Sequence, residues 1–185
     1  MQRIQAVDQT TATGKAKQLL DGVEAKLGFA PLMMRTMASS PAVLDGYLRF
    51  AGALAAGKLS GQLGEQIALA VAEANRCGYC LSAHSTLGKM AGLTEPVISR
   101  NRRAQSDDPA VEAVLRFAQT VVVQKGEVSD EALAAVRAAG YGDAEISEIV
   151  AHVALNIFTN YFNIVAATEV DFPVVTPGVI TAVAA

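Results

Sequence analysis

Helical periodicity runs through almost the whole chain, and it constrains the fold more than any other feature. Apolar residues recur every three to four positions in one segment after another, whereas strand-like alternation is hard to find. Glycine, proline and short polar residues separate the segments and mark where helices stop and start. The pattern therefore predicts an all-α bundle of about eight or nine helices, which a chain of 185 residues can build as a single domain.

These breaks define the predicted elements. The run Val121–Val123 favours a strand by composition, but its surroundings are helical and we predict a helix there. Residues 171–185, which contain Pro173 and Pro177, are predicted to form an extended tail. In chain order, the expected helices are Thr13–Leu27, Leu32–Ala38, Pro41–Ala56, Gln62–Asn75, Cys77–Ala91, a short helix from Thr94, Ala110–Gln124, Asp130–Ala139 and Ala144–Ala167.

Composition bears on assembly and location. Hydrophobic residues make up 51% of the chain, which is more than one small core needs, so we expect a buried interface in a homo-oligomer. The net charge is −3 and both signs are interspersed, so nothing indicates binding to nucleic acid or to an anionic membrane. No signal peptide or membrane span is visible, and we expect a cytoplasmic protein.

Two parts of the chain resemble each other. The letters PAV followed by LRFA occur within residues 41–51 and again within residues 109–118. Glu148 precedes Asn160 by the same twelve positions that separate Glu65 from Cys77. This predicts a duplicated helical unit with halves at about 41–92 and 109–170, although an alanine-rich chain also produces such similarity by chance.

The chemistry-bearing residues gather in one stretch. The only two cysteines, Cys77 and Cys80, form a Cys-x-x-Cys pair, and His84 follows Cys80 by four positions, on the same face of a helix. Glu65 lies twelve positions before Cys77. In the cytoplasm such a cysteine pair is more often catalytic or metal-binding than a structural disulfide.

Three features favour ionisation of the Cys80 thiol, whose unperturbed pKa is about 8.5. The start of a helix stabilises an anion, His84 can take the proton, and Glu65 can hold the imidazole in the useful tautomer. Cys80 would then be the nucleophile, and Cys77 would close a disulfide after Cys80 is oxidised. Glu65 lies off the apolar face of its helix, so this role requires that the second side of the helix is also covered. Otherwise Glu65 is a solvated side chain, and Glu73 on the same helix is a rival carboxylate.

Other interpretations of these residues stay open. The cysteines alone also fit two buried small hydrophobes. With His84 and Glu65 they make a tetrahedral zinc set, although a single Cys-x-x-Cys pair is weak support for structural zinc. Covalent haem is excluded because His84 comes three positions too late, and a thioredoxin site because no βαβ context is present. We therefore expect no resident metal or cofactor.

The predicted last helix carries a polar stripe. Its members lie within about a quarter of the helix circumference, opposite an apolar face that runs from Ile146 to Ile164. Such a stripe is commonly the solvated side of a helix. Asparagines are poor helix formers, however, so three in one helix indicate specific hydrogen bonds, beside the thiols or at an interface. The stripe comprises Glu148, His152, Asn156, Thr159 and Asn163.

The spacing from Glu65 through Cys77 and Cys80 to His84 resembles the signature of the AhpD-like alkyl hydroperoxidases, in the carboxymuconolactone decarboxylase superfamily. Asn160-Tyr161 followed by Asp171-Phe172-Pro173 is similar to the peroxidase-related branch of that group. One departure is Tyr79, which stands between the cysteines where the best-known members have a histidine. The decarboxylase branch lacks the cysteine pair, so the resemblance does not extend to lactone decarboxylation.

The resemblance implies an all-α fold assembled as trimers or hexamers. It also implies reduction of hydroperoxides through a dithiol–disulfide cycle, with a lipoyl-type dithiol, such as a lipoyl-bearing protein, as the electron donor. Cys80 resembles the cysteine that attacks peroxide and Cys77 the resolving cysteine, while His84 and Glu65 resemble the proton relay. A thiol–disulfide exchange adaptor or redox sensor acting on a protein uses the same residues and is the alternative function; a zinc-binding helical scaffold is the second.

Overall fold

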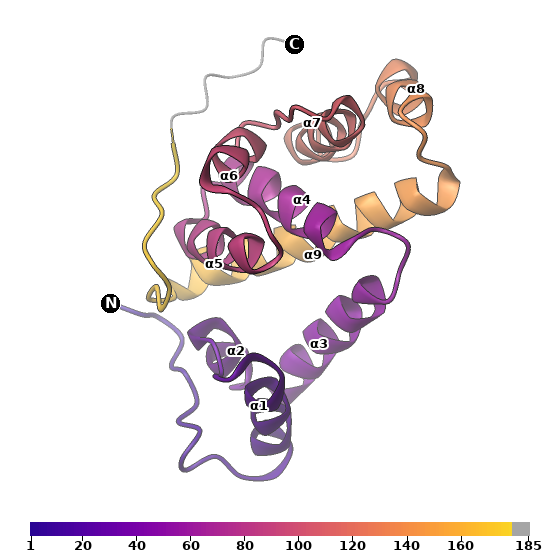
Figure 1. Cartoon of the computed structure of the whole chain (residues 1–185). Coiled ribbons are helices and arrows are strands. Elements are labelled where there is room, and N and C mark those ends of the chain that lie inside the picture. The colour runs from indigo at the N-terminus through magenta and orange to yellow at the C-terminus, as the bar shows by residue number, and fades with distance from the viewer. Residues whose placement is uncertain (179–185) are drawn as a thin grey trace.

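This computed structural model describes residues 1–178. Within these residues the chain forms nine helices and no strand (Figure 1). The predicted all-α class is confirmed, every predicted helix is present, and the run Val121–Val123 is helical. Each predicted helix end lies within one residue of the observed one, because glycine, proline and capping residues mark the ends clearly. The helices are α1 (Gly14–Leu27), α2 (Leu32–Met37), α3 (Pro41–Ala55), α4 (Gly61–Ala74), α5 (Gly78–Met90), α6 (Glu95–Asn101), α7 (Pro109–Val123), α8 (Asp130–Ala138) and α9 (Asp143–Ala166).

Side chains just before the helices satisfy the first backbone N–H groups. The Ser60 hydroxyl accepts a hydrogen bond from the Leu63 N–H at the start of α4, and Asp108 accepts two at the start of α7. Pro41 and Pro109 occupy the first turn of α3 and α7, where a missing N–H costs nothing. These local signals are the reason that the sequence predicts the breaks so closely.

Helix α4 is the centre of the molecule. It packs against α5, α7 and α9, and nine of its 14 residues are buried, from Leu63 to Glu73 (Figure 1). One side of α4 belongs to a core with α1, α2 and α5, to which Leu69 contributes. The other side belongs to a core with α7, α8 and α9, to which Val71 contributes. The second side of α4 is therefore covered, as the catalytic interpretation of Glu65 requires.

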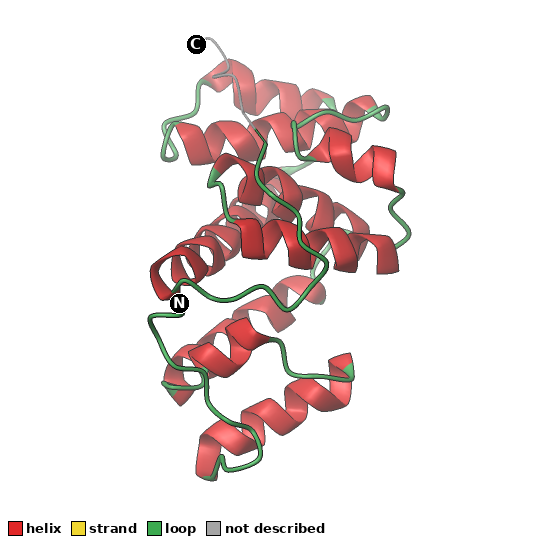
Figure 2. Cartoon of the chain, turned by 90° about the vertical axis from the view of Figure 1, so that its left-hand side faces the viewer, coloured by secondary structure: helices red, strands yellow, loops and turns green. Residues whose placement is uncertain are grey.

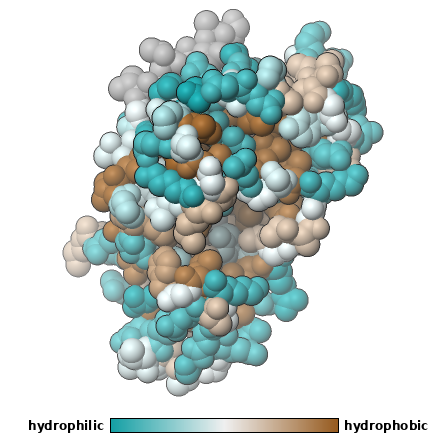
Figure 3. Space-filling model, in the orientation of Figure 1, coloured by the Kyte–Doolittle hydropathy of each residue, from teal (hydrophilic) through white to brown (hydrophobic). Residues whose placement is uncertain are grey.

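The two cores stack along the molecule. Helices α1, α2 and α3 lie at one end, and α7 and α8 lie at the other, with α4, α5 and α9 between them (Figures 1 and 2). Hydrophobic side chains reach the surface across the middle of the face drawn in Figure 3, and mostly hydrophilic ones cover its lower end. The cysteine pair opens α5, so the candidate site lies near the middle of the molecule, beside α4.

Helix α9 is long and apolar enough to span a membrane by length and composition alone. Here it packs against α3, α4, α5 and α7, which is the position of a core helix. Beyond α9, residues 171–178 run without helix or strand alongside α5 and α6, as predicted for the tail (Figure 1). Residues 179–185 of that predicted tail lie outside the described residues. The internal duplication and its halves remain a prediction.

Truncating the buried Val71 to alanine is expected to destabilise the protein by about 2 kcal/mol, because two methyl groups leave water-excluded packing and a cavity remains. Val71 is 0% exposed in α4, whereas Val123 at the end of α7 is 67% exposed. The matched change Val123→Ala should cost no more than about 0.5 kcal/mol. Urea unfolding of both variants measures the difference, and equal losses would contradict the central place of α4.

Candidate active site

Cys77 and Cys80 form a disulfide across the first turn of α5, with Cα atoms 5.4 Å apart. Cys77 is the N-cap of the helix, and its sulfur accepts a hydrogen bond from the backbone N–H of Cys80 over 3.3 Å. The sequence suggests that the helix start acts on Cys80, but the structure puts the sulfur of Cys77 at the capping position. Both residues are buried, Cys77 to 1% and Cys80 to 3% exposure.

His84 and Glu65 form a hydrogen-bonded pair. Nδ1 of His84 lies 2.8 Å from Oε2 of Glu65, and each side chain is only about a fifth exposed. The contact joins α5 to α4, since these helices pack side by side. Because Nδ1 is engaged with the carboxylate, Nε2 is the nitrogen available for proton transfer. The predicted partnership of the two side chains is therefore present in the structure.

The polar stripe of α9 faces the protein interior and is not the solvated side of the helix. Asn156, Thr159 and Asn163 are each at most 5% exposed. The Asn163 amide nitrogen lies 3.4 Å from the sulfur of Cys80 and 3.1 Å from that of Met33, as a donor to both. A neutral N–H aimed at a cysteine sulfur favours its anion, so α9 contributes to the site as one of the two sequence alternatives predicts.

The other two members of the stripe differ in their surroundings: Glu148 holds a loop, and His152 lines the cavity described below. The Glu148 carboxylate accepts hydrogen bonds from the backbone N–H groups of Lys58 and Leu59, and so holds the loop before α4. The His152 ring lies over Gly64, where a Cβ atom would come within 3.2 Å of its Cε1. Burial lowers the pKa of His152, and the carboxylates of Glu148 and Glu65 oppose this shift.

A largely apolar cavity of about 340 Å³ gives access to the site. Its wall contains Cys80, His84 and Glu65, but not Cys77. Side chains of α2, α3, α4, α5 and α9 contribute to the lining, together with Phe29 after α1. Binding sites for small organic molecules have this size and character, with a few polar groups in an apolar wall.

Two tyrosines, Tyr47 and Tyr79, also belong to the site. The sequence indicates no role for Tyr47 and leaves the role of Tyr79 open. Tyr47 of α3 lines the cavity, and burial, together with the nearby charge of Glu65, raises its pKa to about 12. Tyr79 is buried, and its hydroxyl accepts the Met33 N–H over 3.1 Å. The tyrosine between the cysteines therefore ties α2 to α5. No short motif marks Tyr47, which reaches the site only through packing.

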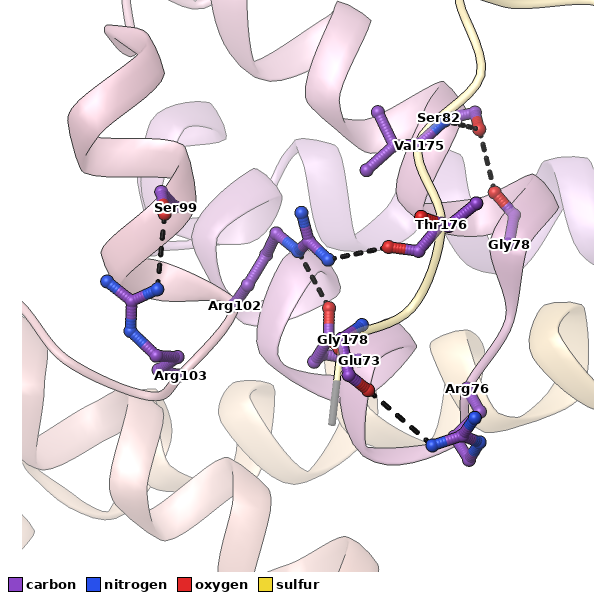
Figure 4. Close-up of polar contacts among 10 residues, drawn as sticks. All are labelled: Glu73, Arg76, Gly78, Ser82, Ser99, Arg102, Arg103, Val175, Thr176 and Gly178. Atoms are coloured by element: carbon purple, nitrogen blue, oxygen red, sulfur yellow. Dashed lines mark hydrogen bonds and ion pairs between the residues drawn. The ribbon is translucent and has the colours of Figure 1, made fainter. Parts of the chain in front are cut away.

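Glu73, the rival carboxylate on α4, has a different partner. Its Oε2 lies 2.7 Å from Nε of Arg102, and its Oε1 accepts the Gly178 N–H over 2.5 Å (Figure 4). It does not line the cavity. Within residues 1–178, no group of three or more His, Cys, Asp or Glu side chains converges in a way that could hold a metal ion, so the zinc alternative has no geometric support.

The family model of the carboxymuconolactone decarboxylase family matches residues 41–120. Among solved structures, the chain is similar to an uncharacterised peroxidase-related protein with an alkylhydroperoxidase AhpD core from Ralstonia eutropha JMP134, with a TM-score of 0.84, 24% identity and 92% of both chains covered. A peroxidase-related protein from Silicibacter sp. TM1040 has a TM-score of 0.78 and 22% identity, over 90% of this chain and 91% of that one. No curated protein matches the sequence.

A third similar structure is a variant of the debrominase Bmp8 in complex with 2,3,4-tribromopyrrole. It has a TM-score of 0.78 and 21% identity, and the alignment covers 91% of both chains. At these identities the structural likenesses establish the fold.

The depressed pKa of His152 predicts a specific loss of stability in acid. As pH falls below the unperturbed value of 6.5, the unfolded chain takes up a proton at this imidazole and the folded chain does not. Stability is therefore lost as pH falls from 6.5 through the folded-state pKa. The His152→Gln variant should show a smaller decline in its urea midpoint between pH 7.5 and pH 5.5 than the unmodified protein; an equal decline would contradict the assignment.

Proposed function

We propose that this chain, which belongs to the AhpD-like carboxymuconolactone decarboxylase superfamily, is a thiol-dependent peroxidase that reduces hydroperoxides through Cys77 and Cys80. One observation carries the proposal: the sulfur-bearing Cys80 shares the wall of an apolar cavity with the hydrogen-bonded pair of His84 and Glu65. The combination offers a nucleophile, a proton carrier and space for a substrate in one place.

The cycle starts from the reduced dithiol. The Cys80 thiolate attacks the outer oxygen of the hydroperoxide, the O–O bond breaks, and Cys80 becomes a sulfenic acid. The alkoxide leaves as an alcohol after taking a proton, which His84 supplies as imidazolium. The Cys77 thiolate then attacks the sulfenic sulfur, the S–O bond breaks, the hydroxide leaves as water after taking a proton from solvent, and the Cys77–Cys80 disulfide forms. An external dithiol reduces this disulfide and is itself oxidised to a disulfide.

Neighbouring groups favour each charge in this cycle. Glu65 holds Nδ1 of His84, which orients the ring and leaves Nε2 to carry the transferred proton. The Asn163 amide, which is a donor toward the sulfur of Cys80, stabilises the attacking thiolate. The N-cap position of Cys77 stabilises the thiolate that resolves the sulfenic acid.

The cavity supports an organic hydroperoxide as the substrate. About 340 Å³ of mainly apolar space is far more than hydrogen peroxide needs, and burial of a hydrocarbon group there would add binding free energy. Burial of both sulfurs disfavours the alternative of a disulfide-exchange adaptor, because a folded protein substrate cannot reach a sulfur that is 3% exposed or less. A competition between peroxide and a protein disulfide for the reduced pair distinguishes the two.

Helix α9 supports the predicted homo-oligomer. Its outward side carries a stripe of large apolar side chains that are between 40% and 62% exposed. Water-exposed side chains of this size in one row are typical of a subunit interface. The trimer or hexamer implied by family resemblance, and a cytoplasmic location, are part of this proposal. The stripe comprises Val150, Phe158, Tyr161, Ile164 and Val165.

Replacing either cysteine should separate the two half-reactions. Cys80→Ser is expected to abolish hydroperoxide consumption, because serine is far less nucleophilic than a thiolate and forms no sulfenic acid. Cys77→Ser should form one equivalent of sulfenic acid on Cys80 and then stop, since nothing resolves it. Dimedone labelling with mass spectrometry measures the sulfenic acid. Continued peroxide consumption by Cys80→Ser with a dithiol donor would refute the peroxidase proposal.

The two carboxylates of α4 provide a matched pair of variants. Glu65→Gln should slow the oxidation of pre-reduced Cys80 by an organic hydroperoxide by about 100-fold, because His84 loses the carboxylate that supports its proton. Glu73→Gln removes the same charge from the same helix, outside the cavity, and should leave this step within about 2-fold. Stopped-flow measurement of the single oxidation step checks both, and equal rates in the two variants would exclude the relay.

A further inference from the structure

The two sulfurs have different surroundings. Cys80 lines the cavity, whereas Cys77 does not and is 1% exposed. The segment 171–178, which we call the strap, runs alongside the N-terminus of α5 (Figure 1). Its residues Phe172 and Val175 pack against the core cluster that contains both cysteines, and Phe172 also lines the cavity. The strap therefore borders the cavity at one end and covers the start of α5 further along.

The first half of the strap is fastened to α2 and α5. The Asp171 carboxylate accepts the Leu32 N–H over 2.5 Å at the start of α2. The Phe172 ring contacts the edge of Tyr79, with ring centres 5.8 Å apart. The Val175 N–H donates to the Ser82 hydroxyl over 2.9 Å, and that hydroxyl donates to the Gly78 carbonyl over 2.8 Å (Figure 4).

The second half is fastened to α4 and the end of α6 through an ion pair whose carboxylate is buried. Nη2 of Arg102 donates to the Thr176 carbonyl over 2.8 Å, while its Nε lies 2.7 Å from Glu73 (Figure 4). Glu73, which is 3% exposed, also accepts the Gly178 N–H. Hydrogen bonds with a charged partner are stronger than neutral ones, so these contacts fasten the strap to α4 and to the end of α6.

The strap crosses α5 next to Cys77. A Cβ atom at Gly78 would lie 3.7 Å from Cδ of Pro177 and 3.9 Å from the carbonyl oxygen of Val175. Backbone therefore lies against the residue that follows Cys77, and a reductant cannot approach that sulfur from this side without displacing the strap.

We infer that the strap, held by Ser82 and Arg102, closes the approach to Cys77, so that the electron donor attacks the sulfur of Cys80 through the cavity. This inference rests on the proposed redox cycle. A donor thiolate bonds to the sulfur of Cys80, the Cys77–Cys80 bond breaks, and Cys77 departs as a thiolate. The donor's second thiolate then attacks its own sulfur in the mixed disulfide, which releases the Cys80 thiolate and leaves the donor as a cyclic disulfide.

The position of Cys77 suits the leaving role. Its sulfur accepts the Cys80 N–H at the start of α5, and this site stabilises a thiolate. A better-stabilised thiolate leaves faster in disulfide exchange, so attack at Cys80 is favoured by both access and chemistry. Ser82 and Arg102 hold the strap but do not line the cavity, and they are positioning residues.

The test measures access to each sulfur separately. The reduced full chain is treated with iodoacetamide, and mass spectrometry gives the alkylation rate of each cysteine at pH values high enough for full ionisation. In the unmodified protein, Cys80 should react at least about 10-fold faster than Cys77. The variants Ser82→Ala, Arg102→Met and their combination should raise the Cys77 rate by about 10-fold and leave the Cys80 rate within about 2-fold.

Arg103→Met is the matched control. Arg103 is the next residue along the chain, and its side chain donates hydrogen bonds to Ser99 (Figure 4) and Gln105 and none to the strap, so its loss should change neither rate. Equal alkylation of both cysteines in the unmodified protein, or a Cys77 rate that is the same in strap and control variants, would overturn the inference. Ser82→Ala, which removes one hydroxyl, keeps the test valid if loss of Arg102 prevents folding.

The outcome is independent of peroxide turnover. Alkylation involves no peroxide and no dithiol, so the proposed peroxidase activity can fail while the difference in access stands, and the reverse is equally observable. Reduction of the oxidised protein provides the second measurement: dithiothreitol should reduce the unmodified protein and the strap variants at similar rates. A bulky protein dithiol should reduce the strap variants faster; if it reduces the unmodified protein just as fast, the strap does not select the donor.

Discussion

The packing of α5 against a helix that is buried on both sides is the constraint on which the site depends. Because α7 and α9 cover the far side of α4 and α5 covers the near side, Glu65 is largely removed from solvent and meets His84 at 2.8 Å. In a partly dehydrated setting this hydrogen bond is stronger than at the surface, and the carboxylate is worth more to a protonated ring. A site of this kind needs a central helix that is buried on both sides yet places a carboxylate at the cavity wall, which α4 does with Glu65.

The sequence predicts the helices and the local half of the site. Cys80 and His84 share a helix face through their spacing, and capping residues mark the helix ends, so both follow from neighbouring positions in the chain. In the sequence, the contribution of Asn163 to the site shows only as an asparagine that is unexpected in a helix. The sequence gives no sign that Tyr47 contributes to the site. Both come from helices far away in the sequence, and their contacts depend on how the helices pack. For the same reason the stripe on α9 looks like a solvated surface until its burial between helices is known.

The two cysteines have identical chemistry in the sequence and divergent environments in the fold. The sequence assigns the helix start to Cys80, but the sulfur of Cys77 is the one that caps it, whereas that of Cys80 faces the Asn163 amide and the cavity. Stabilisation of the two sulfurs is thus divided: a backbone N–H serves Cys77 and a side-chain amide serves Cys80. A dithiol cycle needs such a division, because each sulfur must leave as an anion at a different step.

Tyr79 connects these environments. A histidine at this position would offer another proton carrier, but the tyrosine remains neutral, since burial raises its pKa, and it accepts the backbone N–H of Met33. It packs against Phe172 of the strap, and both residues line the cavity. Tyr79 therefore has a structural role, and in the proposed cycle proton transfer falls to His84. A relay that consists of one imidazole and one carboxylate leaves the rest of the cavity wall apolar, and an apolar wall favours the hydrocarbon part of a substrate over water.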